Sequence, residues 1–453
     1  MKRLLFFILL ATTSSSAQNI ETLTLDNCYI WAADNYPIAK QRGLIKQNTA
    51  LIINTLEKNY LPQIELNAQG SYQTEVTVFA LDIPGVKSPT PLSRDQYKAT
   101  LDVKQIIWDG GVIAMQKKVL ETNGQVENQR VEVEISKLKE RVNQLYFSIL
   151  QADANVDIIK ILKKDLASRT QKAEAAVASG VALKRDVQTL QVEDLKADQR
   201  LTEIRSARAA ALRMLGLLTG KSLSENTILE RPILRGLSDI DLQIERPELK
   251  LFELQKSLID EQTKVYSLKN YPRIMAFGTA GYGRPGLNFL KNEFRPYALA
   301  GVGLKWNLTD LYAKTLKNDL QQIRNNAQVI DIQRDVFLLN TKNTMAQQSA
   351  EIQKWQSLIE SDRQIVALRE KIKESATAQV ENGTLTNNDY LIDLNAESQA
   401  RLNLELHQLQ LLLARISLKT TVANWWAITN NYMDLTNSNN ITTLNSTFYK
   451  FLE

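Results

Sequence analysis

The sequence has one cysteine and one histidine among its 453 residues. A lone cysteine, Cys28, cannot close an internal disulfide, and zinc sites built from cysteine and histidine take several such ligands. His407 is the single histidine, and no arrangement of residues offers a histidine-based triad or another catalytic site. We therefore expect a protein that is not an enzyme and that holds no metal and no cofactor.

Proline and glycine are also scarce, at 10 and 17 residues, and so few breakers of regular structure favour long uninterrupted helices. The formal net charge of +5 gives no footprint of nucleic-acid binding, so we expect no nucleic-acid partner. Beyond the N-terminal segment there is no run of about 18 apolar residues, and we expect no membrane-spanning helix.

The N-terminal residues 1–17 combine a basic start, an apolar run and small residues at positions 15–17, the pattern of a cleaved signal peptide. We therefore expect an exported protein. Cys28 follows Asp26 and Asn27, which is not the pattern of a lipid-attachment site, so we expect no lipid anchor. The cysteine itself is expected to be a small buried residue.

One feature occurs twice: a long amphipathic helix that turns back at a glycine. Residues 112–177 turn at Gly180, and residues 316–380 turn at Gly383. A helix of roughly 65 residues is about 100 Å long, several times the width of an ordinary domain. In the first copy apolar residues step by four and three, the seam of a coiled coil: Val131, Ile135, Leu138, Val142, Leu145, Ile149, Ala152, Val156 and Ile159.

Ahead of each long helix the sequence changes to the period of two that is typical of strands. Residues 23–61 read as a helix slowed at Pro37 and ended at Pro62, and strands are expected at about 63–79 and 96–107. Apolar residues such as Leu66 and Leu101 fall on one face. The other face carries the charged residues Glu65, Glu75, Lys98, Asp102 and Lys104. A second pair of strands is expected at about 273–283 and 296–307.

The order helix, two strands, long helix, turn and return helix occurs twice, and a duplication explains this better than chance. We expect a first structural repeat at residues 18–220, with its turn at 180, and a second at residues 247–429, with its turn at 383. Residues 221–246 are expected to link the repeats, and residues 430–453 form a polar C-terminal tail.

Strands with one apolar and one ionic face suit a lipid bilayer only as a closed barrel, because every backbone group must be paired there. Barrels begin at about eight strands, so four strands need partner chains. The charged residues would then line a wet lumen. Tyr72, Tyr97, Trp108, Tyr282, Tyr297 and Trp306 lie near strand ends and are candidates for an interfacial aromatic belt. A soluble β-sandwich buried against the helices is the alternative.

Together these features resemble the TolC family of outer-membrane efflux and secretion channels. The resemblance rests on the signal peptide, the duplicated halves, Asp109-Gly110-Gly111 after the second strand, and a glycine followed six residues later by aspartate at both turns. It covers nearly the whole chain after residue 17. It implies a mainly α-helical homotrimer in which each protomer gives four strands to a twelve-stranded transmembrane β-barrel, continued by an α-helical tunnel made of coiled-coil hairpins.

The resemblance also implies a function and partners. The chain would be the passive outer-membrane duct of a tripartite efflux or type I secretion system, with its helical portion in the periplasm. Its tips would meet a periplasmic adaptor protein that couples it to an inner-membrane pump of the RND or ABC type. The corresponding tip residues are Gly180, Asp186, Gly383, Thr386 and Asp389.

The two tips differ in detail from the family pattern. Thr386 and Asp389 have the spacing of a capping box, whereas Leu183 stands at the matching hydroxyl position of the first tip. Ile392 stands where the family's best-studied member has a second carboxylate, so an acidic entrance ring is not implied for this chain. The alternative function is a secreted periplasmic coiled-coil scaffold without a pore. The cargo cannot be read from these residues.

Overall fold

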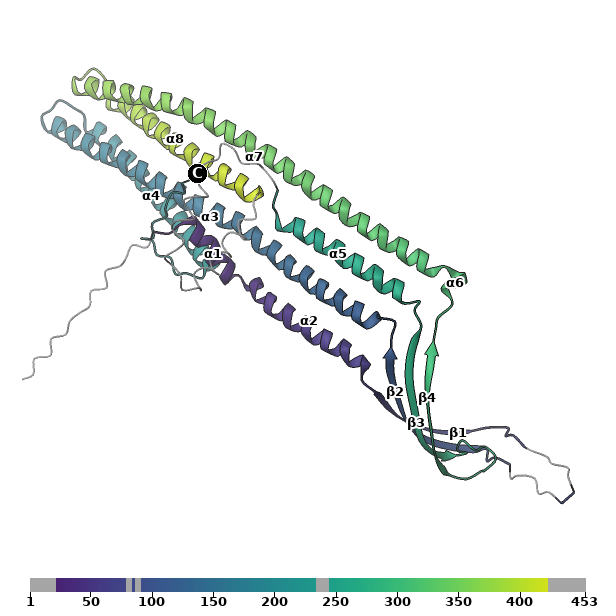
Figure 1. Cartoon of the computed structure of the whole chain (residues 1–453). Coiled ribbons are helices and arrows are strands. Elements are labelled where there is room, and N and C mark those ends of the chain that lie inside the picture. The colour runs from purple at the N-terminus through teal and green to yellow at the C-terminus, as the bar shows by residue number, and fades with distance from the viewer. Residues whose placement is uncertain (1–21, 79–83, 86–90, 234–243, 423–453) are drawn as a thin grey trace, which may run out of the picture. The chain divides into compact units, whose positions relative to one another are not determined.

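The computed structural model describes residues 22–78, 84–85, 91–233 and 244–422 (Figure 1). The predicted signal peptide and the predicted tail at 430–453 lie outside these residues. The described chain folds into long helices and one antiparallel sheet, and none of its described helices is both long enough and apolar enough to cross a membrane.

The chain divides into two compact units, and neither unit coincides with a predicted repeat. The first comprises Met1–Ala39, Glu134–Arg246 and Thr341–Glu453, and the second comprises Lys40–Val133 and Pro247–Asn340. Each unit therefore draws residues from both predicted repeats. The division into repeats at 18–220 and 247–429 stays a prediction, and each unit is described by itself.

The two long helices are present as predicted, as α3 (Val112–Ala178) and α7 (Thr315–Glu381). Each has 67 residues and is therefore about 100 Å long. Eight of the nine seam positions predicted in α3 are buried: Val131, Ile135, Leu138, Val142, Ile149, Ala152, Val156 and Ile159. The three-four spacing therefore identified the packed face of this helix correctly.

In the first unit, α3 and α7 continue into the return helices α4 (Lys184–Thr219) and α8 (Asn387–Val422), and the short α1 (Leu25–Asn35) packs alongside. Cys28 of α1 is fully buried, as expected, and burial raises the pKa of its thiol to about 12. Tyr146 of α3 is also fully buried, and its hydroxyl lies 2.7 Å from the carbonyl oxygen of Leu23 and 2.5 Å from that of Glu230.

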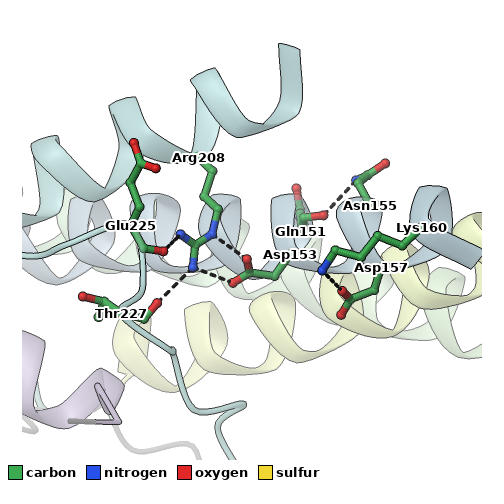
Figure 2. Close-up of polar contacts among 8 residues, drawn as sticks. All are labelled: Gln151, Asp153, Asn155, Asp157, Lys160, Arg208, Glu225 and Thr227. Carbon is green, nitrogen blue, oxygen red and sulfur yellow. Dashed lines mark hydrogen bonds and ion pairs between the residues drawn. The ribbon is translucent and has the colours of Figure 1, made fainter. Parts of the chain in front are cut away.

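The segment that follows α4 is held against α3 by Arg208 (Figure 2). The guanidinium of this α4 residue lies 2.5 Å from a carboxylate oxygen of Asp153 on α3, and it donates to the carbonyl oxygens of Glu225 at 2.6 Å and Thr227 at 2.9 Å. The same segment then forms a parallel bridge between Leu229 and Leu23. One arginine thus joins two helices and a connecting segment of the first unit.

The predicted helix at 23–61 is not continuous, and its residues belong to both units. Proline cannot donate its backbone nitrogen to the preceding turn, and at Pro37 the chain passes from α1 through the 3₁₀ turn η1 (Pro37–Lys40) into α2 (Gln41–Glu57). A second 3₁₀ turn, η2 (Lys58–Tyr60), precedes the first strand. The corresponding helix before the second hairpin is α5 (Pro247–Leu268).

The sheet contains β1 (Gln63–Tyr72), β2 (Asp95–Trp108), β3 (Arg273–Arg284) and β4 (Arg295–Lys305), all antiparallel and in that order. Contacts between side chains of this unit show that the helices next to these strands lie in the corresponding order, α2, α3, α5 and α7. Arg42 of α2 pairs with Glu132 of α3, and Gln129 of α3 donates to the carbonyl oxygen of Pro247 in α5. Lys256 of α5 pairs in turn with Asp331 of α7. Figure 1 shows each strand continuing into its own helix.

Candidate functional site

The sheet has two chemically different faces, which follow from the strand register because residues opposite one another in antiparallel strands share a face. Ile64 lies opposite Val103, Leu101 opposite Ala280, and Ala280 opposite Ala298. Alternation along each strand then gives the members of this apolar face: Ile64, Leu66, Ala68, Tyr97, Ala99, Leu101, Val103, Ile274, Ala276, Ala280, Tyr282, Ala298, Ala300, Val302 and Leu304. Leu66 is 78% exposed and Val302 is 71% exposed, so this chain leaves the face uncovered there.

The opposite face carries the polar residues. Asp102 accepts hydrogen bonds from Asn67 at 2.9 Å, from Thr100 at 2.9 Å and from Thr279 at 2.5 Å. Glu65 lies 3.9 Å from the ammonium of Lys104 on the same face, and alternation along β2 places Lys98 there too. The register thus brings four of the five predicted charged residues together on one surface.

Glu75 is the exception, because β1 ends at Tyr72 and not near residue 79 as predicted. The last backbone bond of the pair runs from Gln73 to the carbonyl oxygen of Arg94 at 2.8 Å. The segment before β2 is hydrogen-bonded elsewhere, because Ser93 exchanges hydrogen bonds with Asn292 of the β3–β4 connection at 3.1 and 2.8 Å. Glu75 therefore lies beyond the paired strand.

Three aromatic rings lie over glycines of neighbouring strands, a feature that the sequence pattern did not suggest. A Cβ added at Gly70 would lie 3.3 Å from the ring of Tyr97. At Gly281 it would lie 2.4 Å from Tyr297, and at Gly301 2.7 Å from Phe277. Tyr97 lies on the apolar face, whereas Tyr297 and Phe277 lie on the polar one, opposite the face that a belt residue would occupy.

The Asp109-Gly110-Gly111 motif makes the change from β2 to α3. Asp109 is buried, and its carboxylate accepts from the backbone N–H groups of Gly111 at 2.9 Å and Ile113 at 2.6 Å, which caps the helix. Gly110 and Gly111 have φ of 76° and 85°, which only glycine adopts without strain. This motif sets the direction in which α3 leaves the sheet.

The two helix tips in the first unit share one turn geometry. Gly180 and Gly383 have φ of 76° and 71°. The N–H of Val181 bonds to the carbonyl of Ala176 at 2.9 Å, and the N–H of Thr384 bonds to the carbonyl of Gln379 at 2.9 Å, the six-to-one bond of a Schellman motif. No atom outside the local chain lies within 4 Å of a Cβ added at either glycine. The glycines are thus required by the backbone conformation rather than by lack of space.

The return helices begin differently at the two tips. The Thr386 hydroxyl accepts from the backbone N–H of Asp389 at 3.2 Å and donates to the Asp389 carboxylate at 2.6 Å. This is half of the predicted capping box, because the carboxylate receives the hydroxyl rather than the backbone N–H of Thr386. At the first tip Leu183 makes no side-chain cap, and Asp186 lies in the first turn of α4.

Behind the tips, ionic side chains link the two helical hairpins. Lys373 of α7 pairs with Asp165 of α3 at 3.1 Å and with Glu397 of α8 at 3.6 Å. Glu397 is 1% exposed and also pairs with Arg401. Lys172 of α3 pairs with Glu381 of α7 at 2.5 Å. Sequence reasoning missed this network because its members lie far apart along the chain.

The network shifts the titration of its members. Burial by itself lowers the pKa of Lys373, but the bond to Asp165 and the nearby Glu397 raise the pKa overall. The pKa of Glu381 is lowered, first by the hydrogen bond that Lys172 donates to it and then by the charge of that lysine. Both shifts favour the charged forms, so the links between the hairpins persist at neutral pH.

His407 is not an isolated surface residue. Its Nδ1 lies 2.5 Å from a carboxylate oxygen of Asp362 on α7, and its ring lies 5.1 Å from that of Trp355. Among the described residues there is no group of three histidine, cysteine, aspartate or glutamate side chains that could hold a metal ion.

Comparison with known proteins was made by sequence and by structure. No protein-family profile matches the chain, and no curated protein matches its sequence. Several solved structures, however, match the structure of the chain. The outer-membrane protein VceC of Vibrio cholerae has a TM-score of 0.61 at 15% identity, covering 88% of this chain and 94% of VceC.

Two further structures resemble the chain similarly. The CmeC outer-membrane channel of Campylobacter jejuni has a TM-score of 0.62 at 12% identity, and the match covers 88% of this chain and 85% of CmeC. The MtrE outer-membrane channel of Neisseria gonorrhoeae has a TM-score of 0.60 at 14% identity, covering 88% of both chains. The chain therefore has the fold of outer-membrane channel proteins. For a single protomer this is the fold that the resemblance to the TolC family implies, and that part of the prediction is confirmed. The trimer stays a prediction.

Proposed function

We propose that this protein is a passive exit duct of the outer membrane, formed by three copies of the chain. The observation that carries the proposal is the sheet of the second unit. Its register separates an exposed apolar face from a polar one, and within the described residues β1 and β4 each have an unpaired edge. Lipid tolerates the apolar face but not the open edges, so strands of further copies must pair with them.

Three copies give twelve strands, enough to close a barrel whose polar faces line a water-filled lumen. Glu65, Lys98, Asp102 and Lys104 are the proposed lumen residues, and Glu75 would lie beyond the strands. The fold similarity to outer-membrane channels supports this function and location. The periplasmic scaffold is disfavoured because a scaffold has no use for an apolar sheet face without a cover.

The duct itself supplies no energy, so a partner has to drive export. We propose that the tips bind a periplasmic adaptor of an RND-type or ABC-type pump through Gly180, Asp186, Gly383, Thr386 and Asp389. A pocket of about 750 Å³ lies among the tip residues, and its lining includes Arg169, Lys172 and Glu381. The proposed docking surface is therefore polar and hollowed.

The channel is tested by fractionation and conductance. We expect a heat-resistant trimer in outer-membrane fractions and ion conductance when the trimer is added to a planar bilayer. A stable monomer in mild detergent, or a trimer without conductance, would contradict the proposed function.

Docking is tested at the glycines. Gly180→Val and Gly383→Val should still give inserted trimers, because the sheet belongs to the other unit, but should lose adaptor cross-linking and export. Gly383→Asn is the matched control, since asparagine tolerates the left-handed conformation far better than valine. Thr386→Ala should cost only about 1 kcal/mol of capping. Normal docking and export by both valine variants would exclude the tips as the docking site.

A further inference from the structure

A pocket of about 420 Å³ lies in the second unit where β4 leads into α7. The short helix α6 (Asp310–Ala313) occurs in this connection. The pocket's described lining has an apolar part, made by Trp306, Leu308, Leu316 and Leu320, and a cationic part, made by Lys314 and Lys317. No acidic side chain is found among the described residues that line it. An apolar floor whose lining also includes two lysines matches a ligand that is both apolar and anionic.

The pocket lies at the end of the apolar face of the sheet. Leu304 lies on that face opposite Ile274, and Trp306 follows two residues later. The indole N–H of Trp306 donates to the carbonyl oxygen of Asn270 at 2.9 Å, yet the residue is 56% exposed. An exposed indole at the end of an apolar surface is typical of the boundary between lipid and water.

The corresponding junction of the first hairpin is built differently. There Lys117 pairs with Glu57 at 2.6 Å and Lys118 pairs with Glu261 at 3.2 Å. These two ammonium groups are neutralised within the protein. At the second junction Lys314 and Lys317 are among the residues that line the pocket, and the described part of the chain shows no ion pair for either, so an external anion would complete the site.

Lys314 adds an observation from the backbone. Its φ is 52°, and it is the one non-glycine residue with positive φ among the residues the structure describes. A lysine, unlike a glycine, is strained in this conformation, and this strained residue is one of those that line the pocket.

We propose that this pocket binds the headgroup of an anionic phospholipid, with the phosphate between Lys314 and Lys317 and the first part of the acyl chains against Trp306 and Leu308. The proposal rests on the proposed function, because it takes the apolar face of the sheet to lie in a bilayer. The ligand would come from the leaflet that meets this end of the sheet.

The test measures which lipids stay with the protein. The full chain is inserted into phosphatidylcholine vesicles that contain a minor fraction of phosphatidylglycerol, extracted in mild detergent, and analysed for retained lipid by mass spectrometry. A lysine near an anionic surface strengthens binding about fivefold, so the wild-type protein should enrich phosphatidylglycerol by more than that. Lys314→Gln combined with Lys317→Gln should abolish the enrichment.

Two variants separate the pocket from general surface charge. Lys314→Gly removes one ammonium and the backbone strain together, so enrichment should fall about fivefold while thermal stability is kept or raised. Leu308→Trp fills the pocket and keeps both lysines, and it should also lose enrichment. The charge-matched control is Lys160→Gln with Lys196→Gln, two exposed lysines of the first unit in helical i,i+3 pairs, which should behave as wild type.

The outcomes distinguish this inference from the proposed function. Failure of the wild-type chain to enter vesicles as a trimer would overturn both. Insertion without enrichment, or enrichment that survives in the double glutamine variant, would overturn the lipid site and leave the channel in place. Enrichment that survives in Leu308→Trp would likewise overturn the pocket, because surface charge alone would then account for it.

Discussion

Arg208 offers the sharpest test of how the first unit is held together. Its side chain is 14% exposed, and it joins a carboxylate of α3 to two backbone carbonyls of the segment after α4 (Figure 2). Arg208→Met keeps most of the stem but removes every donor. A hydrogen bond to a charged group contributes about 1.5–3 kcal/mol, and the freed Asp153 carboxylate, 36% exposed, can regain water. We therefore expect this variant to lower the free energy that holds the segment after α4 in place by about 3 kcal/mol.

Hydrogen exchange can localise this loss. The N–H of Glu230 bonds to the carbonyl of Leu23 at 2.9 Å, and the N–H of Leu23 bonds to that of Ile228 at 2.9 Å, so both amides report release of the segment. A loss of about 3 kcal/mol corresponds to exchange roughly a hundredfold faster.

Asp153→Asn is the matched control, because it removes the ion pair and leaves Arg208 on both carbonyls. Its effect should be less than half as large. If Arg208→Met leaves exchange at Glu230 unchanged, or if Asp153→Asn has the full effect, the carbonyl bonds do not hold the segment and the argument is wrong.

Three further predictions concern the sheet, a buried charge and a junction. Leu101→Arg on the apolar face should impair membrane insertion by about 2–4 kcal/mol near mid-bilayer, whereas the neighbouring Asp102→Asn should still insert, and equal effects in a vesicle-insertion assay would refute the assignment of faces. Lys139 is 7% exposed, and burial followed by the charge of Arg246 lowers its pKa to about 8, below the usual 10.5. The folded protein thus loses this proton at lower pH than the unfolded chain does. The free energy of unfolding should therefore rise by about 3 kcal/mol as the pH increases from about 8 to 10.5. Urea titrations at several pH values should show this rise, and Lys139→Met should lack it. Gly110→Ala should lower the melting temperature, because φ is 76° and the new Cβ would lie 2.8 Å from that of Tyr271; an unchanged melting temperature would contradict this.

The local pattern of the sequence was enough for most of the regular structure. The seam of α3, the glycine turns and the two hairpins follow from spacings of a few residues, and a helix or strand repeats those spacings over its whole length. The long helices α3 and α7 end within one residue of the predicted position. Pro37 also indicated an interruption, although one helix was predicted over residues 23–61.

Contacts between distant residues decided what the pattern could not. β1 ends at Tyr72, and the segment before β2 is instead hydrogen-bonded at Ser93 to Asn292, so Glu75 lies outside the strand. The place of Tyr297 on the polar face depends on its register opposite Gly281.

The sequence by itself determined most of the residues that form helices and strands and which positions within one strand share a face, because these depend on neighbours within a few residues. The tertiary structure decided which charges meet. Lys373 finds Asp165 and Glu397, Arg208 finds Asp153, and Lys314 and Lys317 line a common pocket. A charged residue on an exposed helix face has several partners within reach of its side chain. Only the packing of one helix against another selects among them.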